Sequence, residues 1–454
     1  MHILSKSTYI KGLQCEKALY MTKKHPYLRD KLSIEKRAKF QRGTDVGILA
    51  QAYYPGGINM SPNSPSQFPK KVKETLENIQ NPMVNVMYEA VFQYNDTLIM
   101  VDLLVRDGYQ WKAIEVKSSL KLSTTYYNDA ALQYYVLHGC GVPLSDFQLM
   151  HLNADYVKDG PIDVKQLFKL VSIIDYAKEQ ESIIAANVKR LKDVVALPHS
   201  PLCNIGTQCH EPYTCDFLGH CWKLIPKNSF LYTTALPDQQ LFDYYFGGYG
   251  SNEKLLQQLD PESEEVHQIE ALESNTYYID YKALFAQAPN PKPNRVGFLN
   301  LLIDRPAVPE LDGTRPYQEL LLAFALTGDQ EPNENTLWDC FDDHSRWHEG
   351  VERIESLLSH YDLVVTFTPN QPMGFRAFNL QEVLANAKMF HPCLKDGYNL
   401  QNTAKALFHD VKLFEHSRIL VETLGKESTG YQQAREDLIT ENEVVKRIYQ
   451  HFFR

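Results

Sequence analysis

Two carboxylates and one ammonium lie on two neighbouring apolar stretches of this sequence, where their chemistry could be combined. Asp102 lies in the first stretch, and Glu115 and Lys117 follow in the second, thirteen and fifteen residues later. The dipeptide Asp107-Gly108 between them favours a tight hairpin turn. Carboxylate oxygens suit Mg²⁺ and Mn²⁺, and a nearby ammonium can stabilise charge on a phosphate. This pattern therefore indicates metal-assisted hydrolysis of a phosphodiester.

A hairpin would place all three groups on one face of a sheet. The expected turn pairs Asp102 with Ala113, and side chains along a strand alternate between faces, so Glu115 and Lys117 share the face of Asp102. Charges on a mostly buried strand are costly unless they are paired or bound to a metal. A bound metal would also lower the pKa of a water molecule. The alternative interpretation is an ordinary hairpin whose charged face is solvated.

Eight cysteines occur in the 454 residues, and five of them suggest metal binding. Four fall in one run with five residues between neighbours, and the fifth lies far upstream; they are Cys203, Cys209, Cys215, Cys221 and Cys15. No secretory signal is recognised at the start of the sequence, so we expect a cytoplasmic protein whose thiols bind a metal rather than form disulfides. The spacing is wider than in structural zinc sites, and an iron–sulfur cluster needs four thiolates, which leaves one over. We expect Cys140, Cys340 and Cys393 to be core thiols.

Taken together, these residues resemble the iron–sulfur members of the PD-(D/E)XK nuclease superfamily, which include RecB-type nuclease domains and CRISPR-adaptation exonucleases. The segment from Cys209 to Cys221 is the most specific part of the resemblance. In such relatives one N-terminal and three C-terminal cysteines staple the ends of the nuclease core through a [4Fe–4S] cluster. The resemblance assigns this cluster, or zinc as the alternative, to Cys15, Cys209, Cys215 and Cys221. It leaves Cys203 as a further candidate.

The same resemblance implies a catalytic set on the hairpin. Asp102, Glu115 and the Val116 carbonyl would bind Mg²⁺ or Mn²⁺, and Lys117 would assist the attacking water. Glu89 lies on the strand expected before the hairpin and is a further candidate for this site.

Two expected helices carry the remaining motifs. Arg42–Ala50 resembles the first nuclease motif, but Val46 and Gly47 stand where many relatives have a metal-binding His. Asp129–Tyr135 resembles the helix that follows the hairpin. We expect its Gln133 to contact DNA or to steady the site.

The resemblance implies an α/β protein with two domains. Residues 1–225 should form a restriction-endonuclease-like core with a mixed central sheet flanked by helices, and residues 226–290 a connecting segment. Residues 291–454 resemble an RNase H-like exonuclease domain of the DEDD type, but Asn300 and Leu302 replace the metal-binding acids of its first strand. We expect this domain to be degenerate and to serve binding or scaffolding.

The charge is divided unevenly along the chain. The net charge of −10 combines +4 in residues 1–225 (26 basic and 22 acidic) with −14 in the remainder (20 basic and 34 acidic). The first fifty residues hold 11 basic and 4 acidic side chains, which suits a phosphate backbone. The acidic second half would repel nucleic acid, so we expect it to bind protein. No run of eighteen apolar residues occurs, so no membrane span is expected.

We therefore predict a metal-dependent DNA nuclease with a structural iron–sulfur cluster, by resemblance an exonuclease that acts on single strands or ends. A second interpretation is a non-catalytic nucleic-acid-binding or scaffold subunit of a repair or defence complex. A third places exonuclease activity in the C-terminal domain, against which Asn300 and Leu302 argue. The intact set of Asp102, Glu115 and Lys117 favours the first, because a disused site tends to lose such costly charges.

Overall fold

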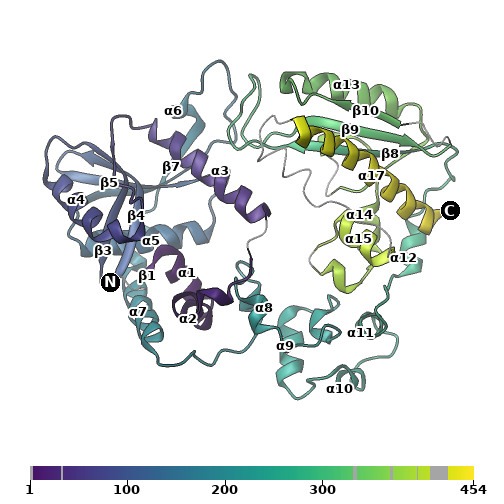
Figure 1. The fold of residues 1–454 in the computed structure, drawn as a ribbon, viewed down its shortest axis with the longest axis horizontal. Coiled ribbons are helices and arrows are strands. Elements are labelled where there is room, and N and C mark those ends of the chain that lie inside the picture. The colour runs from purple at the N-terminus through teal and green to yellow at the C-terminus, as the bar shows by residue number, and fades with distance from the viewer. Residues whose placement is uncertain (1–3, 32–33, 331–334, 369–371, 396, 409–427) are drawn as a thin grey trace. The chain divides into compact units, whose positions relative to one another are not determined.

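The chain divides into two compact units (Figure 1). Unit 1 comprises Met1–Trp222 with Pro306–Tyr317, and unit 2 comprises Lys223–Arg305 with Gln318–Arg454. Each unit has one mixed β-sheet flanked by helices, which confirms the α/β class. The computed structural model describes residues 4–31, 34–330, 335–368, 372–395, 397–408 and 428–454, without the side chains of 34–42, 372 and 428–430.

The sheet of unit 1 has the strand order β2-β3-β4-β5-β6-β7, and β1 pairs with β4 outside this path. The strands are β1 (Leu4–Ser5), β2 (Ile58–Asn59), β3 (Val86–Tyr94), β4 (Thr97–Asp107), β5 (Gln110–Lys117), β6 (Leu144–Leu152) and β7 (Phe168–Ser172). β4 is antiparallel to both β3 and β5, whereas β5 and β6 are parallel. β3 to β6 are rich in branched and aromatic residues, which pack well on a pleated surface.

Helix α5 is enclosed in the core of unit 1. All residues from Ala130 to Leu137 are buried, and the helix packs on α7 and on strands β3, β4 and β6. The helices of this unit are α1 (Lys6–Gln14), α2 (Glu16–Lys24), α3 (Ile34–Gln51), α4 (Phe68–Gln80), α5 (Thr124–Gly139), α6 (Val164–Leu167), α7 (Ile174–Ala196) and α8 (Leu218–Cys221). A helix that is apolar on most sides, as α5 is, requires such an enclosed position.

Strands β4 and β5 separate where the predicted site residues lie. Their last pair is Leu103 opposite Ile114, although both strands continue beyond it. β5 stays paired with β6 as far as Lys117, while β4 pairs with β1 at Thr97 and Leu98. We call the point beyond Leu103 and Ile114, where the two strands diverge, the β4–β5 fork.

The hairpin turn between β4 and β5 is one residue further along than predicted. Asp107 lies outside the centre of the turn and pairs with Gln110. Gly108 takes the first central position with a φ of 62°. Because glycine has no Cβ, it adopts this left-handed backbone without steric cost, which explains why the turn is centred on Gly108 and Tyr109.

This shift means that the predicted pairing of Asp102 with Ala113 was wrong, because Ala113 lies opposite Leu104. Every partner moves by two positions. Since side chains alternate with a period of two, no residue changes face. Asp102, Glu115 and Lys117 therefore still share one face of the hairpin.

Residues 306–317 leave the sheet of unit 2 between β8 and β9 and belong to unit 1. Ala307, Val308 and Tyr317 pack in the apolar cluster that includes residues of α3, β4 and β5. The Tyr317 hydroxyl donates a hydrogen bond to the carbonyl of Ser118, the residue that follows β5. No pattern in the sequence predicted this exchange.

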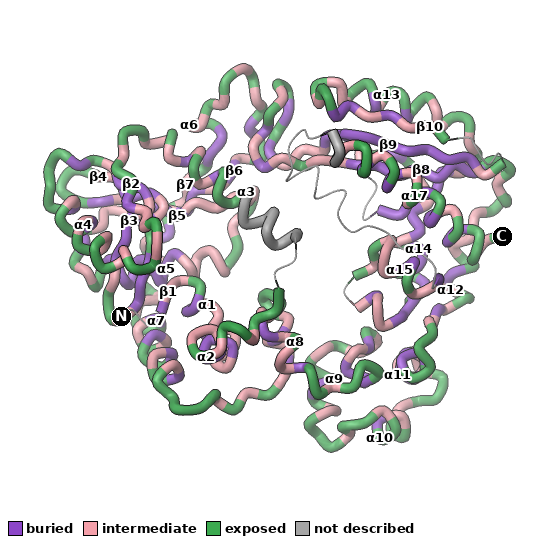
Figure 2. Tube along the Cα trace, in the orientation of Figure 1, coloured by how far each residue is buried: buried purple, intermediate pink, exposed green. Residues whose placement is uncertain are grey.

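The sheet of unit 2 has the order β10-β9-β8-β11-β12. Its strands are β8 (Val296–Asp304), β9 (Leu320–Gly328), β10 (Asn335–Asp339), β11 (Leu363–Thr366) and β12 (Phe378–Asn379). β9 is antiparallel to both neighbours, and β8, β11 and β12 run parallel to one another. All nine residues of β9 are buried (Figure 2), which explains its continuous apolar sequence.

Helices before and after this sheet complete unit 2. They are α9 (Asp238–Phe246), α10 (Asn252–Leu256), α11 (Glu264–Ser274), α12 (Tyr281–Ala286), α13 (Trp347–Leu358), α14 (Leu380–Asn386), α15 (Leu400–Leu407) and α17 (Ser428–Phe453). The predicted connecting segment, residues 226–290, thus contains α9 to α12 and lies in unit 2. Within the described part of the chain, every helix is too short or too polar to cross a lipid bilayer.

Candidate functional site

The β4–β5 fork brings the predicted carboxylates and Val116 together. The Val116 amide donates a hydrogen bond to Asp102 Oδ2 at 2.6 Å. Glu115, one residue earlier, is only 2% exposed, and the side chain of Lys117 is 13% exposed. The alternative of a solvated charged face is therefore wrong.

Both carboxylate oxygens of Glu115 accept hydrogen bonds. Oε1 accepts from Lys117 Nζ at 2.8 Å and from Lys6 Nζ at 2.5 Å. Oε2 accepts from Gln133 Nε2 at 2.6 Å. Lys6 begins α1 directly after the N-cap residue Ser5, so the start of this helix delivers a second ammonium to the fork.

Helix α5 contributes two side chains that are one turn apart. Asp129 Oδ2 accepts a hydrogen bond from Lys117 Nζ at 3.0 Å, and Gln133 lies four residues later on the same face. Gln133 is fully buried. Of its two predicted roles, the structure therefore gives it the steadying of Glu115 and does not place it to contact DNA.

Glu89 on β3 is a third carboxylate, beside Asp102 on β4 and Glu115 on β5. β3 pairs with β4 immediately before and after it, at Tyr88 and Ala90, so Glu89 lies level with Asp102. Its φ of 53° is uncommon for a residue other than glycine, and such strain is typical of functional sites. Burial and the charge of Glu115 raise the pKa of Glu89.

The charges in the fork are unevenly compensated. Burial raises the pKa of Glu115, but Lys6 and Lys117 outweigh it and hold this pKa below its ordinary value. Burial lowers the pKa of Lys117, but Glu115 and Asp129 outweigh it, so the ammonium stays protonated. Burial and the charge of Glu115 raise the pKa of Asp102 well above its ordinary value of 3.8. A further cation near Asp102 would restore its ionised form.

The donor atoms at the fork suit a hard cation. Asp102, Glu115 and Glu89 come from adjacent strands, and carboxylate oxygens are the ligands that Mg²⁺ and Mn²⁺ prefer. Among the described residues no three His, Cys, Asp or Glu side chains form a ready metal-binding group. Oε1 of Glu115 is instead bonded to two ammonium groups. Oε1 of Gln133 is buried and has no hydrogen-bond partner within the described ranges, and a water carried by a cation would provide the donor.

Helix α3 carries the predicted first motif, Arg42–Ala50. Val46 is 1% exposed and packs in the same apolar cluster as Leu103 and Ile114. This helix therefore supports β4 and β5 by packing. Part of the predicted basic segment lies outside the described side chains, namely Lys36, Arg37 and Lys39.

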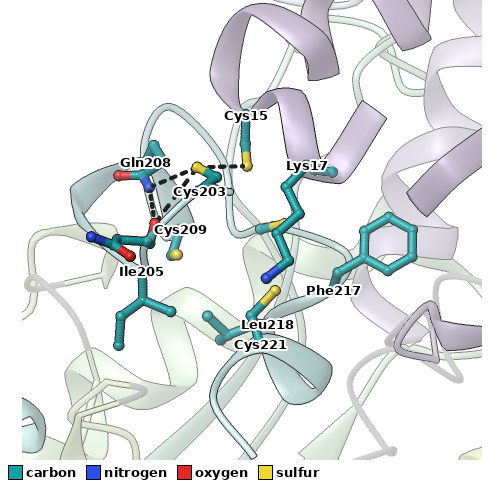
Figure 3. A pocket seen from close by; sticks show the side chains of 12 residues that line it. Cys15, Lys17, Cys203, Ile205, Gln208, Cys209, Phe217, Leu218 and Cys221 are labelled. Atoms are coloured by element: carbon teal, nitrogen blue, oxygen red, sulfur yellow. Dashed lines mark hydrogen bonds between the residues drawn. The ribbon is translucent and has the colours of Figure 1, made fainter. Parts of the chain in front are cut away.

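Five cysteines surround one pocket of unit 1. It is lined by Cys15, Cys203, Cys209, Cys215 and Cys221. Figure 3 shows the sulfur atoms of Cys15 and Cys203 facing each other, 3.7 Å apart. Two thiolates of a tetrahedral zinc site with bonds of about 2.3 Å would lie about 3.8 Å apart. This separation is consistent with Cys203 as a candidate ligand in the zinc alternative.

The cysteine segment is tied to helices α1 and α2. Gln14 Nε2 donates hydrogen bonds to the carbonyls of Gln208 at 2.8 Å and Tyr213 at 2.6 Å. The buried apolar residues that join the two parts are Ala18, Met21 and Phe217. Because this apolar cluster is small, a metal held by the cysteines would supply much of the local stability.

Two thiols of this pocket, Cys15 and Cys215, resist ionisation. Burial raises the pKa of Cys15 to about 11 and that of Cys215 to about 11. Metal ligands are thiolates, so the positive charge of a metal or cluster is needed to ionise these groups at neutral pH. The donor set therefore fits the predicted cluster or zinc.

The two positions of β8 where the resemblance expects metal-binding acids carry no carboxylate. Asn300 and Leu302 are 4% and 3% exposed, and Asn300 Nδ2 donates to Glu441 Oε2 on α17 at 2.5 Å. Next to it, the Asn442 amide donates to backbone carbonyls of β8 and β9 at 2.9 and 2.7 Å. These contacts stabilise the packing of α17 on the sheet, and the degeneracy of this domain stays a prediction.

Sequence reasoning missed Lys6 and Asp129. The spacing of four residues between Asp129 and Gln133 on an expected helix was a signal that could have revealed Asp129. Lys6 lies 109 residues from Glu115 in the chain. No local pattern could have joined these two residues.

Comparison with known proteins assigns no family to this chain. Neither a scan of protein-family models nor a search of curated proteins finds a match to the chain.

Proposed function

We propose that this protein is a metal-dependent nuclease that hydrolyses DNA phosphodiester bonds at the β4–β5 fork. The observation that carries this proposal is the gathering of Asp102, Glu115 and Lys117 on one face, with Glu115 buried. Well-packed apolar residues would often stabilise such a hairpin as well as or better than buried charges. Buried charges with shifted pKa values are typical of functional sites, so we infer that they are kept for chemistry.

The three predicted site residues and their neighbours Val116 and Glu89 each have a role in this reaction. Asp102, Glu115 and the Val116 carbonyl would hold Mg²⁺ or Mn²⁺, with Glu89 as a further ligand. The bound cation lowers the pKa of a water and neutralises charge on the phosphate. Lys117 keeps its proton, so it acts by donating hydrogen bonds and positive charge to the nucleophile or the phosphate and not as a base.

Three residues of α5 position the groups that react. Gln133 holds one oxygen of Glu115, and Asp129 holds the ammonium of Lys117. The ring of Tyr126 lies 4.9 Å from that ammonium and adds a cation–π contact. These contacts restrict the orientation of both side chains.

We infer that the cysteines hold a [4Fe–4S] cluster, with zinc as the alternative. Cys15 and the segment 203–221 are far apart in the chain but line one pocket. The metal would join helices α1 and α2 to the segment that follows α7. Its role is then structural.

A second pocket of unit 1 supports nucleic acid as the partner. Basic and aromatic side chains line it, namely Tyr20, Lys24, His25 and His199. Basic groups bind phosphates. Single strands or ends are the proposed substrates, and the acidic second half is proposed to bind protein.

Cleavage of labelled DNA tests the proposal. We expect the protein to cut single strands or ends in Mn²⁺ or Mg²⁺ and to stop in excess chelator. Glu115→Gln should lower the cleavage rate more than about 100-fold. Removing a residue that only hydrogen-bonds to a metal ligand already lowers activity about 10–100-fold, and Glu115 is itself a proposed ligand. The matched control is Glu181→Gln, which removes a carboxylate bonded to His138 and should leave the rate unchanged.

Two results would contradict the proposal. DNA binding without cleavage by the wild type in either metal would favour the scaffold interpretation. Cleavage that Glu115→Gln does not affect would move the reaction away from the fork.

Gln133→Met should lower the cleavage rate about 10–100-fold, because Glu115 loses the hydrogen bond that orients it. Methionine is similar in length, so the packing of α5 is kept. Steady-state rates at several Mn²⁺ concentrations measure this effect. Gln148→Met removes a similar amide–carboxylate bond on β6 and should have no effect. Equal rates for the two variants would remove Gln133 from the site.

A further inference from the structure

Lys6 is the residue at the fork that neither the sequence pattern nor the proposed reaction uses. Its Nζ lies 2.5 Å from Glu115 Oε1, the oxygen that also accepts from Lys117 at 2.8 Å. Gln133 occupies the other oxygen of the same carboxylate. A carboxylate oxygen offers about two lone pairs, so Oε1 has no position left for a metal. One ammonium must leave before Glu115 can become a ligand through this oxygen.

The contacts of the two lysines decide which one leaves. Lys117 is held a second time by Asp129 at 3.0 Å, and its side chain is 13% exposed. The side chain of Lys6 is 31% exposed. It extends from the first residue of α1. Lys6 is therefore the ammonium that can move toward solvent at the lower cost.

We propose that Lys6 is a built-in competitor of the divalent cation, which occupies its place on Glu115 in the metal-free protein and is displaced when the metal binds. This inference rests on the proposed function of the fork. Lys6 neutralises the buried carboxylate of Glu115 while the site holds no metal. The free energy needed to move Lys6 away from Glu115 therefore weakens the binding of the cation. It sets how tightly the protein binds the cation, as a positioning residue outside the reaction.

Direct binding of Mn²⁺ to the full chain, without DNA, tests this role. Titration followed by the electron paramagnetic resonance of free Mn²⁺ should give Lys6→Met an affinity about 10-fold to 100-fold above the wild type, because one charge-assisted hydrogen bond no longer competes. Lys6→Arg keeps the charge and should bind like the wild type. Lys192→Met is the matched control. It removes a lysine of similar exposure that pairs with Asp96 at 2.7 Å, away from the fork, and should change nothing.

The outcomes separate this inference from the proposed function. Asp102→Asn should abolish the binding, and if it binds Mn²⁺ like the wild type, the cation lies elsewhere and the proposed function fails. If binding depends on Asp102 while Lys6→Met binds no tighter than the wild type, the fork is a metal site and only the competition by Lys6 is overturned. An increase of similar size for Lys192→Met would reduce the effect to net charge and would also overturn it.

Discussion

Asp102→Asn is expected to abolish cleavage and, at the same time, to stabilise the metal-free protein. Loss of a metal ligand should lower the cleavage rate more than about 100-fold. Loss of a residue that only hydrogen-bonds to a ligand already lowers activity about 10–100-fold. Burial and the charge of Glu115 raise the pKa of Asp102 in the folded protein, so its ionised form is unfavourable there. Asparagine has no charge to bury and can still accept the hydrogen bond from Val116. The free energy of unfolding should rise at neutral pH, by about 1.4 kcal/mol for each unit by which folding raises this pKa.

The pH dependence of this stabilisation has a definite sign. Because the pKa of Asp102 is higher in the folded chain than its ordinary value of 3.8, the wild type loses stability as the pH rises through the folded pKa. Asparagine does not titrate. The difference between variant and wild type should therefore vanish in acid and grow toward neutral pH.

Urea unfolding with chelator present, followed by a signal from unit 1, measures this effect. Asp107→Asn is the control, since this exposed carboxylate lies on the same hairpin outside the fork. It should change neither rate nor stability. A destabilised Asp102→Asn variant would mean that the charge is compensated in the metal-free protein, which contradicts our account of the fork.

Cys15→Ser is expected to remove the bound metal and to loosen the cysteine segment. The wild type should contain about four iron atoms per chain if a [4Fe–4S] cluster is present, or zinc in the alternative. The binding of a structural metal is worth about 10 kcal/mol or more to folding. Only a small apolar cluster holds this segment otherwise. Metal analysis should show the loss, and limited proteolysis should cut between residues 197 and 222.

Two further cysteine variants make this experiment decisive. Cys140→Ser changes a thiol that donates to the Gln93 carbonyl outside the pocket and should keep the metal. Cys203→Ser should keep iron if the ligands are the four assigned by resemblance, and lose zinc if Cys203 is a ligand. Wild type prepared without oxygen that contains neither iron nor zinc would contradict a metal at this site.

Local periodicity in the sequence predicted the two strands of the hairpin and which of their side chains share a face. The strands around Asp102 and Glu115 follow from alternation, whereas the helix of Gln133 was expected from the resemblance. The register of the hairpin was wrong by two residues. This error did not change the predicted site, because a register shift of two residues leaves every side chain on the same face of the sheet.

Contacts between distant parts of the chain could not be predicted in this way. Lys6 reaches Glu115 only because β1 pairs with β4 and α1 begins at that point. The solvated alternative for the hairpin failed for the same reason, since the burial of Glu115 comes from α5 and α1. The facing sulfur atoms of Cys15 and Cys203 likewise depend on how the two segments fold together.

The return of residues 306–317 to unit 1 has a consequence for how the gene can be divided. A fragment that ends near residue 225 would contain the whole fork but would lack Ala307 and Tyr317, which cover apolar side chains of α3 and β5. A fragment that starts near residue 223 would carry the same loop without the surface on which it packs. Each fragment should therefore be less stable than the same part of the full chain.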